Sequence, residues 1–187
     1  MTKLKGILLT EGMHGMISQV EGLAKALDIN FSHHTVETKG FWKLIPPKLT
    51  PITDSVFKKI DSHDIDIIIS CGRKSIIPSL YLKKNSKKKL FNIHIQNPKV
   101  KLDNFDLVVV PEHDNLDGNN VLKTKGAIHY LTTEEIDKNK EYLFNISSKL
   151  KDRKIISLIL GGPTQYYDYT DRNIQEIFSK VNYLVKE

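Results

Sequence analysis

The stretch LVVVPEHDNL, residues 107–116, decides the fold class and raises the question of function. Its apolar half, LVVV, is a short unbroken run ended by a proline, which is typical of a strand buried on both faces. Its polar half places an acid, an imidazole and a second acid side by side, at Glu112, His113 and Asp114. In open parallel sheets, ligands bind beyond the carboxyl ends of the strands. The polar half is therefore either a solvated loop or one wall of a binding cleft.

Apolar runs of the same kind recur along the chain and alternate with segments of helical periodicity. Strands are predicted at residues 4–10, 29–36, 65–70, 89–95, 105–110 and 154–160. Helices are predicted over residues 16–27, 55–60, 72–84, 132–150 and 174–184. The fourth of these opens with Thr132 and Glu135 in the spacing of a capping box. Continuous apolar strands that alternate with amphipathic helices predict an α/β, Rossmann-like doubly wound domain with a mostly parallel sheet.

The composition narrows the class of protein. The chain has 187 residues, of which 40% are hydrophobic and 27% charged, as expected for a soluble globular protein. No apolar run approaches the roughly 18 residues that span a bilayer, and the N-terminus lacks the layout of a signal peptide. We therefore expect a cytoplasmic protein without an integral membrane segment. Cys71 is the only cysteine, which excludes an internal disulfide and a cysteine-based metal site.

The net charge of +6 comes mostly from lysine, because arginine occurs only at Arg73, Arg153 and Arg172. The densest basic run, KKNSKKK at residues 83–89, has no aromatic residues interleaved, unlike many nucleic-acid-binding surfaces. We interpret this run as a solvated loop, with a weak and salt-sensitive anionic contact as the alternative. No nucleic-acid partner, cofactor or metal ion is expected.

The turns that follow the predicted strands carry residues suited to ligand binding. The first turn, EGMHG, has Gly12 and Gly15 ahead of a helix whose free N–H groups suit an anion. The turn after the third strand, SCGRKS, has Gly72, Arg73 and Ser75. A guanidinium group can bind two oxygens of a phosphate or carboxylate at once. These residues are predicted to bind a ligand, with tight structural turns as the alternative.

Further candidates follow the later strands. Gln96 follows the fourth strand, Asn119 follows the fifth, and Gly161 and Gly162 follow the sixth and could cradle a phosphate. His113 is the candidate acid–base group, because histidine ordinarily titrates closest to neutral pH, and Glu112 and Asp114 complete the predicted catalytic set. Because separate solvated loops have no need to concentrate such residues at strand ends, their joint occurrence favours a cleft.

Six segments resemble, in their order, those of the mitochondrial-fission family named for the plant Elongated-mitochondria protein. They are GLAKAL, IIISCGRKS, IHIQNPK, FDLVVVPEHD, GNNVLKTKGAIHYLT and LILGGPTQYY, and the resemblance runs from about residue 7 to 167. It implies a fold like that of the GT-B glycosyltransferases, in which two Rossmann-like halves face a cleft. It further implies a first domain over residues 1–150 and only the opening strand–helix unit of a second domain over 151–187. The first turn departs from the family's pattern at Met13 and His14.

Two functions stay open on the sequence. One is a glycosyltransferase-like enzyme, or its truncated remnant, which binds a nucleotide-sugar or another small anionic ligand. The other is a non-catalytic binding or scaffold protein. Whether this chain is itself an enzyme stays open, as do peripheral contact with a membrane and self-association through the incomplete second domain.

Overall fold

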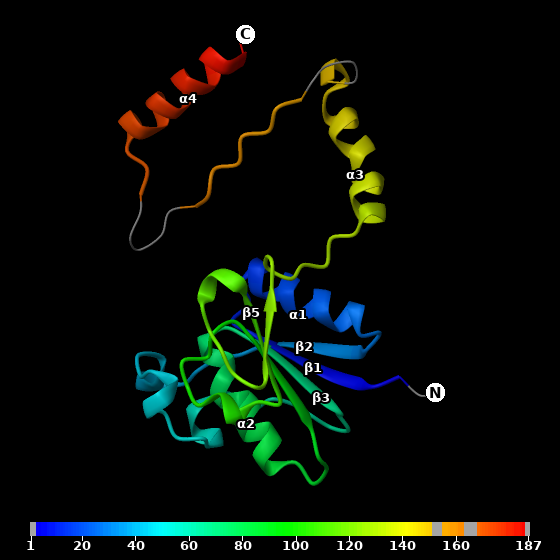
Figure 1. Ribbon diagram of the computed structural model, residues 1–187, viewed down its shortest axis with the longest axis vertical. Helices are drawn as coiled ribbons and strands as arrows, with labels where there is room; N and C mark the ends of the chain where they lie inside the picture. The colour runs from blue at the N-terminus through cyan, green and yellow to red at the C-terminus, as the bar shows by residue number, and fades with distance from the viewer. Residues whose placement is uncertain (1–2, 151–154, 163–167, 186–187) are drawn as a thin grey trace. The chain divides into compact units, whose positions relative to one another are not determined.

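The computed structural model describes residues 3–150, 155–162 and 168–185 (Figure 1). The chain divides into two compact units, residues 1–136 and 137–187, which we call unit 1 and unit 2. Unit 1 contains the sheet. The predicted division of the chain at residue 150 stays a prediction.

Unit 1 is built on a six-stranded sheet in which every pair of neighbouring strands runs parallel. The strands are β1 (Lys5–Thr10), β2 (Asn30–Thr35), β3 (Ile67–Cys71), β4 (Phe91–Ile95), β5 (Leu107–Pro111) and β6 (Val121–Thr124). Their order across the sheet is β2-β1-β3-β4-β5-β6. The chain winds from β1 outward to β2, then returns to the other side of β1 and continues from β3 to β6. This confirms the predicted α/β, Rossmann-like doubly wound fold.

Helices cover both faces of the sheet (Figure 1). Helix α1 (His14–Ala26) packs on one face, where Val20 belongs to the same buried cluster as Val109 of β5. Helix α2 (Ile76–Asn85) packs on the other, where Leu80 shares a cluster with Val108 and Val110. Successive side chains of a strand point to opposite faces, so the unbroken valine run fills both cores. This is why the central strands read as continuous apolar runs rather than as alternating ones.

The long connection between β2 and β3 contains three 3-10 turns, η1 (Gly40–Lys43), η2 (Pro47–Leu49) and η3 (Asp54–Val56). The predicted helix over residues 55–60 is wrong, because only the single turn η3 forms there. The backbone of residues 56–58 instead forms hydrogen bonds with the backbone of residues 37–39. The N–H of Lys39 donates to the Val56 carbonyl at 2.7 Å, and the N–H of Lys58 donates to the Glu37 carbonyl at 2.9 Å.

Short 3-10 turns also flank later strands. They are η4 (Arg73–Ser75), η5 (Leu102–Asn104) and η6 (Glu112–Asp114). After β6, helix α3 (Thr133–Ile146) begins with the predicted capping box, and the turn η7 (Ser148–Leu150) follows it. The Thr132 hydroxyl accepts the N–H of Glu135, and the Glu135 carboxylate accepts the N–H of Thr132, both at 3.2 Å.

Unit 2 ends in helix α4 (Asp171–Val185), which confirms the predicted last helix. Thr170 and Asn173 cap its start reciprocally, each side-chain oxygen accepting the other residue's backbone N–H at 3.2 Å. The strand predicted at 154–160 is wrong over its described part, because residues 155–160 form no strand and Ile159 is 90% exposed. A strand needs hydrogen-bonded neighbours. The described residues of unit 2 contain no other strand to provide them.

Candidate functional site

The strand order of the sheet reverses between β1 and β3. From β1 the chain moves to β2 on one side, and it then places β3 on the other side. In doubly wound sheets ligands bind at such a switch point, outside the carboxyl ends of the strands. The turns that flank it are residues 11–13, after β1, and residues 72–73, after β3. We call the surface formed by these two turns the switch-point site.

The first turn is tied to the end of β2. Gly12 has φ +85°, a conformation that favours glycine, and a Cβ there would lie 3.1 Å from the Thr35 Cγ2. The Gly12 N–H donates to the Thr10 hydroxyl at 3.1 Å, and that hydroxyl lies 2.8 Å from the His33 Nε2. Burial lowers the pKa of His33, while the nearby Glu21 carboxylate acts in the opposite direction. The turn is therefore held in one shape by its neighbours.

The second turn is packed closely against the first. Gly72 has φ +92°, and a Cβ at this position would lie 2.7 Å from the Met16 Sδ and 2.9 Å from the Glu11 Oε1. The buried Ser75 hydroxyl donates to the Gly72 carbonyl at 2.7 Å. Ser75, a predicted ligand-binding residue, thus stabilises the conformation of the turn at Gly72.

Glu11 joins the two turns. Its Oε1 accepts the backbone N–H of Lys74 at 3.0 Å, and its Oε2 lies 3.1 Å from the Lys74 Nζ. The Glu11 side chain is only 15% exposed. Backbone N–H groups at the start of the η4–α2 segment would attract an external anion. The Glu11 carboxylate already occupies that position. Neither Glu11 nor Lys74 was among the predicted site residues, and the one available signal was an acid directly after the first buried strand.

The start of α1 is open by contrast. The helix has no side-chain cap and no acid in its first turn. The N–H groups of Met16 and Ile17 donate to the Met13 carbonyl. A Cβ added at Gly15 would meet no neighbouring atom within 4 Å, so the space beside this residue is open. Backbone N–H groups at a helix start attract anions through hydrogen bonding and the helix dipole. This helix start, beside the Gly12 turn, is the part of the site best suited to a phosphate group.

Arg73 belongs to the second turn and is exposed. One of its guanidinium nitrogens, Nη2, donates to the Lys43 carbonyl at 2.8 Å. A guanidinium carries five N–H donors, so this contact leaves donors for an anionic ligand. Arg73 therefore joins the site to the long connection between β2 and β3. Its role in binding an anion stays a prediction.

Cys71 of β3 and His94 of β4 are buried, and burial shifts the pKa of each side chain away from neutral pH. Burial, reinforced by the Glu11 carboxylate, raises the pKa of the Cys71 thiol to about 12. A thiol that stays protonated and buried packs as a small apolar residue and does not act as a nucleophile. Burial lowers the pKa of His94 to about 3, and its Nδ1 lies 2.9 Å from the Ser70 hydroxyl.

The predicted catalytic residues follow β5 at the same edge of the sheet. Glu112–Asp114 form the turn η6, and Asn115, with φ +48°, ends it in the left-handed conformation. The His113 side chain is 77% exposed, and its Nε2 lies 3.8 Å from the Asp114 Oδ1. Gln96 follows β4, between this turn and the switch point, and also has a positive φ of 85°. The strand ends thus bring these residues to one edge.

The remaining predicted site residues lie elsewhere. Asn119 precedes β6, so it belongs to the amino edge of the sheet, and the adjacent Asn120 amide donates to the Leu102 and Phe105 carbonyls there. Gly161 and Gly162 are exposed residues of unit 2. The structure therefore does not place Asn119 with the switch-point site, and the roles of the two glycines stay predictions.

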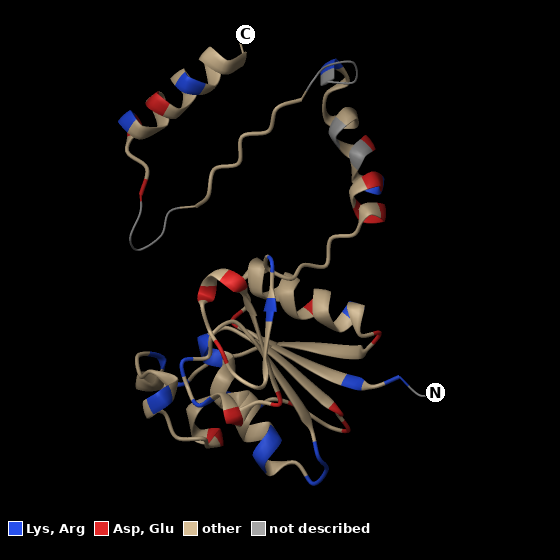
Figure 2. Cartoon of the chain, in the orientation of Figure 1, with Lys and Arg blue, Asp and Glu red and all other residues tan. Residues whose placement is uncertain are grey.

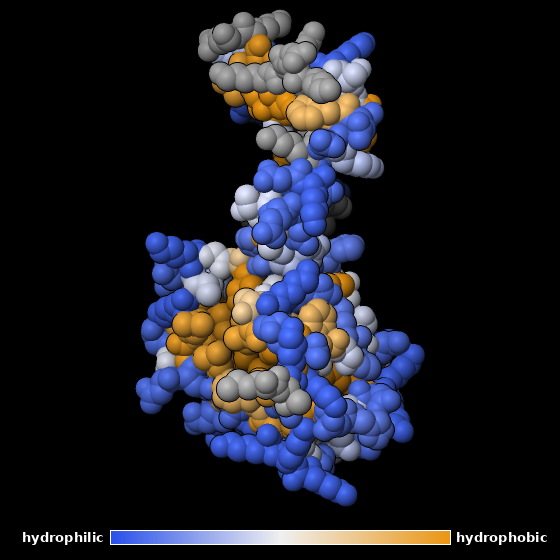
Figure 3. Space-filling view, turned by 90° about the vertical axis from the view of Figure 1, so that its right-hand side faces the viewer, coloured by the Kyte–Doolittle hydropathy of each residue, from blue (hydrophilic) through white to orange (hydrophobic). Residues whose placement is uncertain are grey.

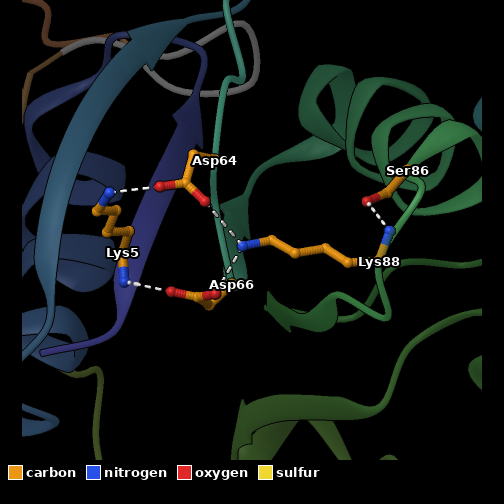
Figure 4. Close-up of polar contacts among 5 residues, drawn as sticks. All are labelled: Lys5, Asp64, Asp66, Ser86 and Lys88. Atoms are coloured by element: carbon orange, nitrogen blue, oxygen red, sulfur yellow. Dashed lines mark hydrogen bonds and ion pairs between the residues drawn. The ribbon is translucent and has the colours of Figure 1, made fainter. Parts of the chain in front are cut away.

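The amino edge of the sheet carries a different set of features. A network of charged residues joins Lys5, Asp64, Asp66 and Lys88 (Figure 4). The Lys88 Nζ lies 2.8 Å from Asp66 and 3.3 Å from Asp64, while Lys5 donates its N–H to Asp66 at 2.8 Å and pairs through Nζ with Asp64. These lysines lower the pKa of both carboxyl groups. Beside the network lies a cavity of 890 Å³ with Phe57 and Tyr81 in its lining.

No group of three or more His, Cys, Asp or Glu side chains in the described ranges could hold a metal ion. Within the same ranges, no helix has the length and apolar character needed to cross a membrane.

Comparison with known proteins gives one family. The family model described as Mitochondrial fission ELM1 matches residues 14–187. The Mitochondrial fission protein ELM1 of Arabidopsis thaliana is 35% identical over 48 residues, which make up 26% of this chain and 11% of the plant protein. No solved structure matches the chain.

Proposed function

The chain belongs to the Mitochondrial fission ELM1 family, and we propose that unit 1 is the Rossmann-like half of a GT-B glycosyltransferase-like protein. Its ligand in this proposal is a nucleotide-sugar, or a closely related phosphorylated compound, bound at the switch-point site. The observation that carries the proposal is the strand reversal between β1 and β3, with two glycine turns beside it. A parallel sheet presents its ligand surface at this place.

The ligand's phosphate groups suit the start of α1. The first turn of α1 contains no acidic residue, and Gly12, in the turn before it, has no side chain. Arg73, directly after Gly72, supplies a guanidinium whose described side-chain contact is to a carbonyl rather than to an acid. Lys74, by comparison, is neutralised by Glu11. Helix dipole, backbone donors and one guanidinium together favour a di-anionic phosphate.

Glycosyl transfer needs a group that removes a proton from the acceptor hydroxyl as it attacks the sugar carbon. In the proposal His113 takes that proton, the new bond forms to the acceptor oxygen, and the nucleoside diphosphate leaves with the electrons of the broken bond. Asp114, at 3.8 Å from the imidazole, would stabilise the imidazolium that results. Glu112 lies beside them in the same turn.

Isothermal titration calorimetry of the full chain with uridine diphosphate and with a uridine-diphosphate hexose tests the binding claim. We expect Arg73→Lys to weaken binding about tenfold, because the ammonium group cannot bind two phosphate oxygens in the same plane. Arg172→Lys, in α4 of unit 2, is the matched control and should leave the affinity unchanged. Absence of heat at millimolar nucleotide, or an equal loss in both variants, would overturn the proposal.

A non-catalytic binding role is the second candidate. It is favoured by the 77% exposure of His113, because a base that acts on a bound acceptor is usually shielded from water. The distinction is made by mass-spectrometric analysis of a nucleotide-sugar incubated with the chain and with His113→Gln. Release of nucleoside diphosphate that His113→Gln abolishes supports the enzyme. Tight binding without turnover supports the binding protein.

A further inference from the structure

The loop formed by residues 39–53 exposes large apolar side chains. Phe41 is 63% exposed, Leu44 82% and Leu49 72%. The loop has three prolines and two 3-10 turns, so it is neither a helix nor a strand that could add to another sheet. We call it the apolar loop, and it lies at the left of unit 1, in cyan, in Figure 1.

The apolar loop is anchored, so its exposed residues are not a displaced part of the core. Trp42 packs against a cluster that contains Val56, Phe57 and Ile77. The Lys43 carbonyl accepts a hydrogen bond from Arg73 at 2.8 Å, and the buried Thr50 hydroxyl donates to the Pro46 carbonyl at 2.9 Å. Trp42 therefore fixes the loop from within, and Phe41 contacts Trp42 with ring centroids 4.3 Å apart, whereas Leu44 and Leu49 are exposed.

The charges on the apolar loop all have one sign. Lys39, Lys43 and Lys48 are exposed, and the sequence has no Asp or Glu between residues 38 and 53. Lys48 also lines a cavity of 560 Å³ together with Lys99 and Lys101, which extends the basic surface beyond the loop. Figure 2 shows the lysine segments along this part of the chain.

A second apolar area on unit 1 provides a contrast. Leu27, Phe31 and Phe91, at the amino ends of the strands, are between 37% and 48% exposed, and apolar surface is visible from the N-terminal side in Figure 3. That area is bordered by paired charges of both signs, among them the network of Figure 4 and the Lys3–Asp28 pair. The apolar loop differs from this area, because it combines exposed apolar side chains with lysines and contains no acid.

We infer that the apolar loop docks unit 1 on the surface of a membrane that contains anionic phospholipids. Phenylalanine and leucine side chains gain free energy by entering the boundary between headgroups and acyl chains. Lysines beside them are attracted to the negative surface potential of anionic lipids. A second copy of the chain would bring lysines against lysines, so charge complementarity favours the lipid surface. This inference does not rest on glycosyl transfer.

Sedimentation of the full chain with vesicles tests the inference, using phosphatidylcholine alone and phosphatidylcholine mixed with phosphatidylglycerol. We expect binding to the mixed vesicles only, with a partition coefficient that falls as salt is added. Leu44→Ser with Leu49→Ser should reduce partitioning about tenfold or more, since both leucines would enter the interface. Lys43→Gln with Lys48→Gln should reduce it about fivefold per lysine. Trp42 fluorescence checks that the loop keeps its fold in each variant.

Three control variants decide whether the loop is responsible. Leu27→Ser with Phe91→Ser removes apolar surface at the amino edge, and Lys87→Gln with Lys89→Gln removes the same charge from the 83–89 run. Both should leave partitioning nearly unchanged.

The third control is Phe178→Ser with Leu184→Ser in α4, which tests the exposed apolar face of unit 2. The inference is overturned if this control or either of the other two matches the loop variants. It is also overturned if the mixed vesicles do not bind the chain, or if Leu44→Ser with Leu49→Ser abolishes self-association in light scattering without changing vesicle binding.

Discussion

Replacement of Gly72 by alanine is the sharpest test of how the switch-point site is built. The backbone there has φ +92° and ψ 160°, a region that residues with a Cβ rarely adopt, and its cost is about 1–3 kcal/mol. The new Cβ would also lie 2.7 Å from the Met16 Sδ and 2.9 Å from the Glu11 Oε1. Met16 can move aside, whereas displacing Glu11 weakens its hydrogen bond to Lys74, which costs about 1 kcal/mol more. We expect Gly72→Ala to lower the free energy of unfolding by about 2–4 kcal/mol.

Urea unfolding followed by the fluorescence of Trp42, the only tryptophan, measures this change in unit 1. The midpoint should fall while the dependence of free energy on urea stays constant. Gly15→Ala is the matched control, because no atom lies within 4 Å of its Cβ position and its φ is not positive. It should change stability by less than about 0.5 kcal/mol, or increase it slightly. A loss below about 1 kcal/mol in Gly72→Ala would refute the reasoning, because strain alone accounts for that much.

Three further predictions follow from the packing and the buried titratable groups. Gly22→Ala should destabilise unit 1 by about 1–3 kcal/mol, because its Cβ would lie 2.5 Å from the backbone of His129; urea unfolding with an unchanged midpoint would contradict this. Burial lowers the folded-state pKa of His94 to about 3, so the unfolded chain binds the extra proton, and stability should fall as pH drops from about 6.5 toward 3. The slope attributable to this residue approaches about 1.4 kcal/mol per pH unit and should disappear in His94→Asn; equal slopes in both proteins would exclude it. Cys71, with its pKa raised to about 12, should react with a disulfide reagent at pH 8 only as fast as unit 1 opens, and rapid reaction in native conditions would show that the thiol is accessible.

Much of the fold could be predicted from local sequence pattern. The runs KGILLT, IIISC and LVVVP are mostly apolar and buried, with Thr10 and Ser70 the buried polar exceptions, and such runs are typical of a sheet covered on both faces. The capping box at Thr132 and Glu135 likewise depends only on residues three apart. Because such features depend on residues close together in the chain, they can be predicted from a single sequence.

Other features depend on partners distant in the chain. The run at 155–160 is as apolar as β3, yet a strand also requires neighbours, which no local pattern reports. The segment 55–60 has helical spacing but bonds to residues 37–39 instead. Glu11 and Lys74 are 63 residues apart, and their pairing follows from β3 lying next to β1. The strand ends of the site could therefore be predicted, whereas the ion pair at its centre could not.

The central claim is that a phosphorylated ligand binds at the carboxyl edge of the sheet, between the turns after β1 and β3. An amide NMR titration of the full chain with uridine diphosphate tests it most directly, because it reports which edge is occupied. The account predicts saturable shifts at Gly12, Gly15 and Gly72, loss of those shifts in Arg73→Ala, and no change at Lys88 on the amino edge. Shifts confined to the amino edge, or none at millimolar nucleotide, would contradict it.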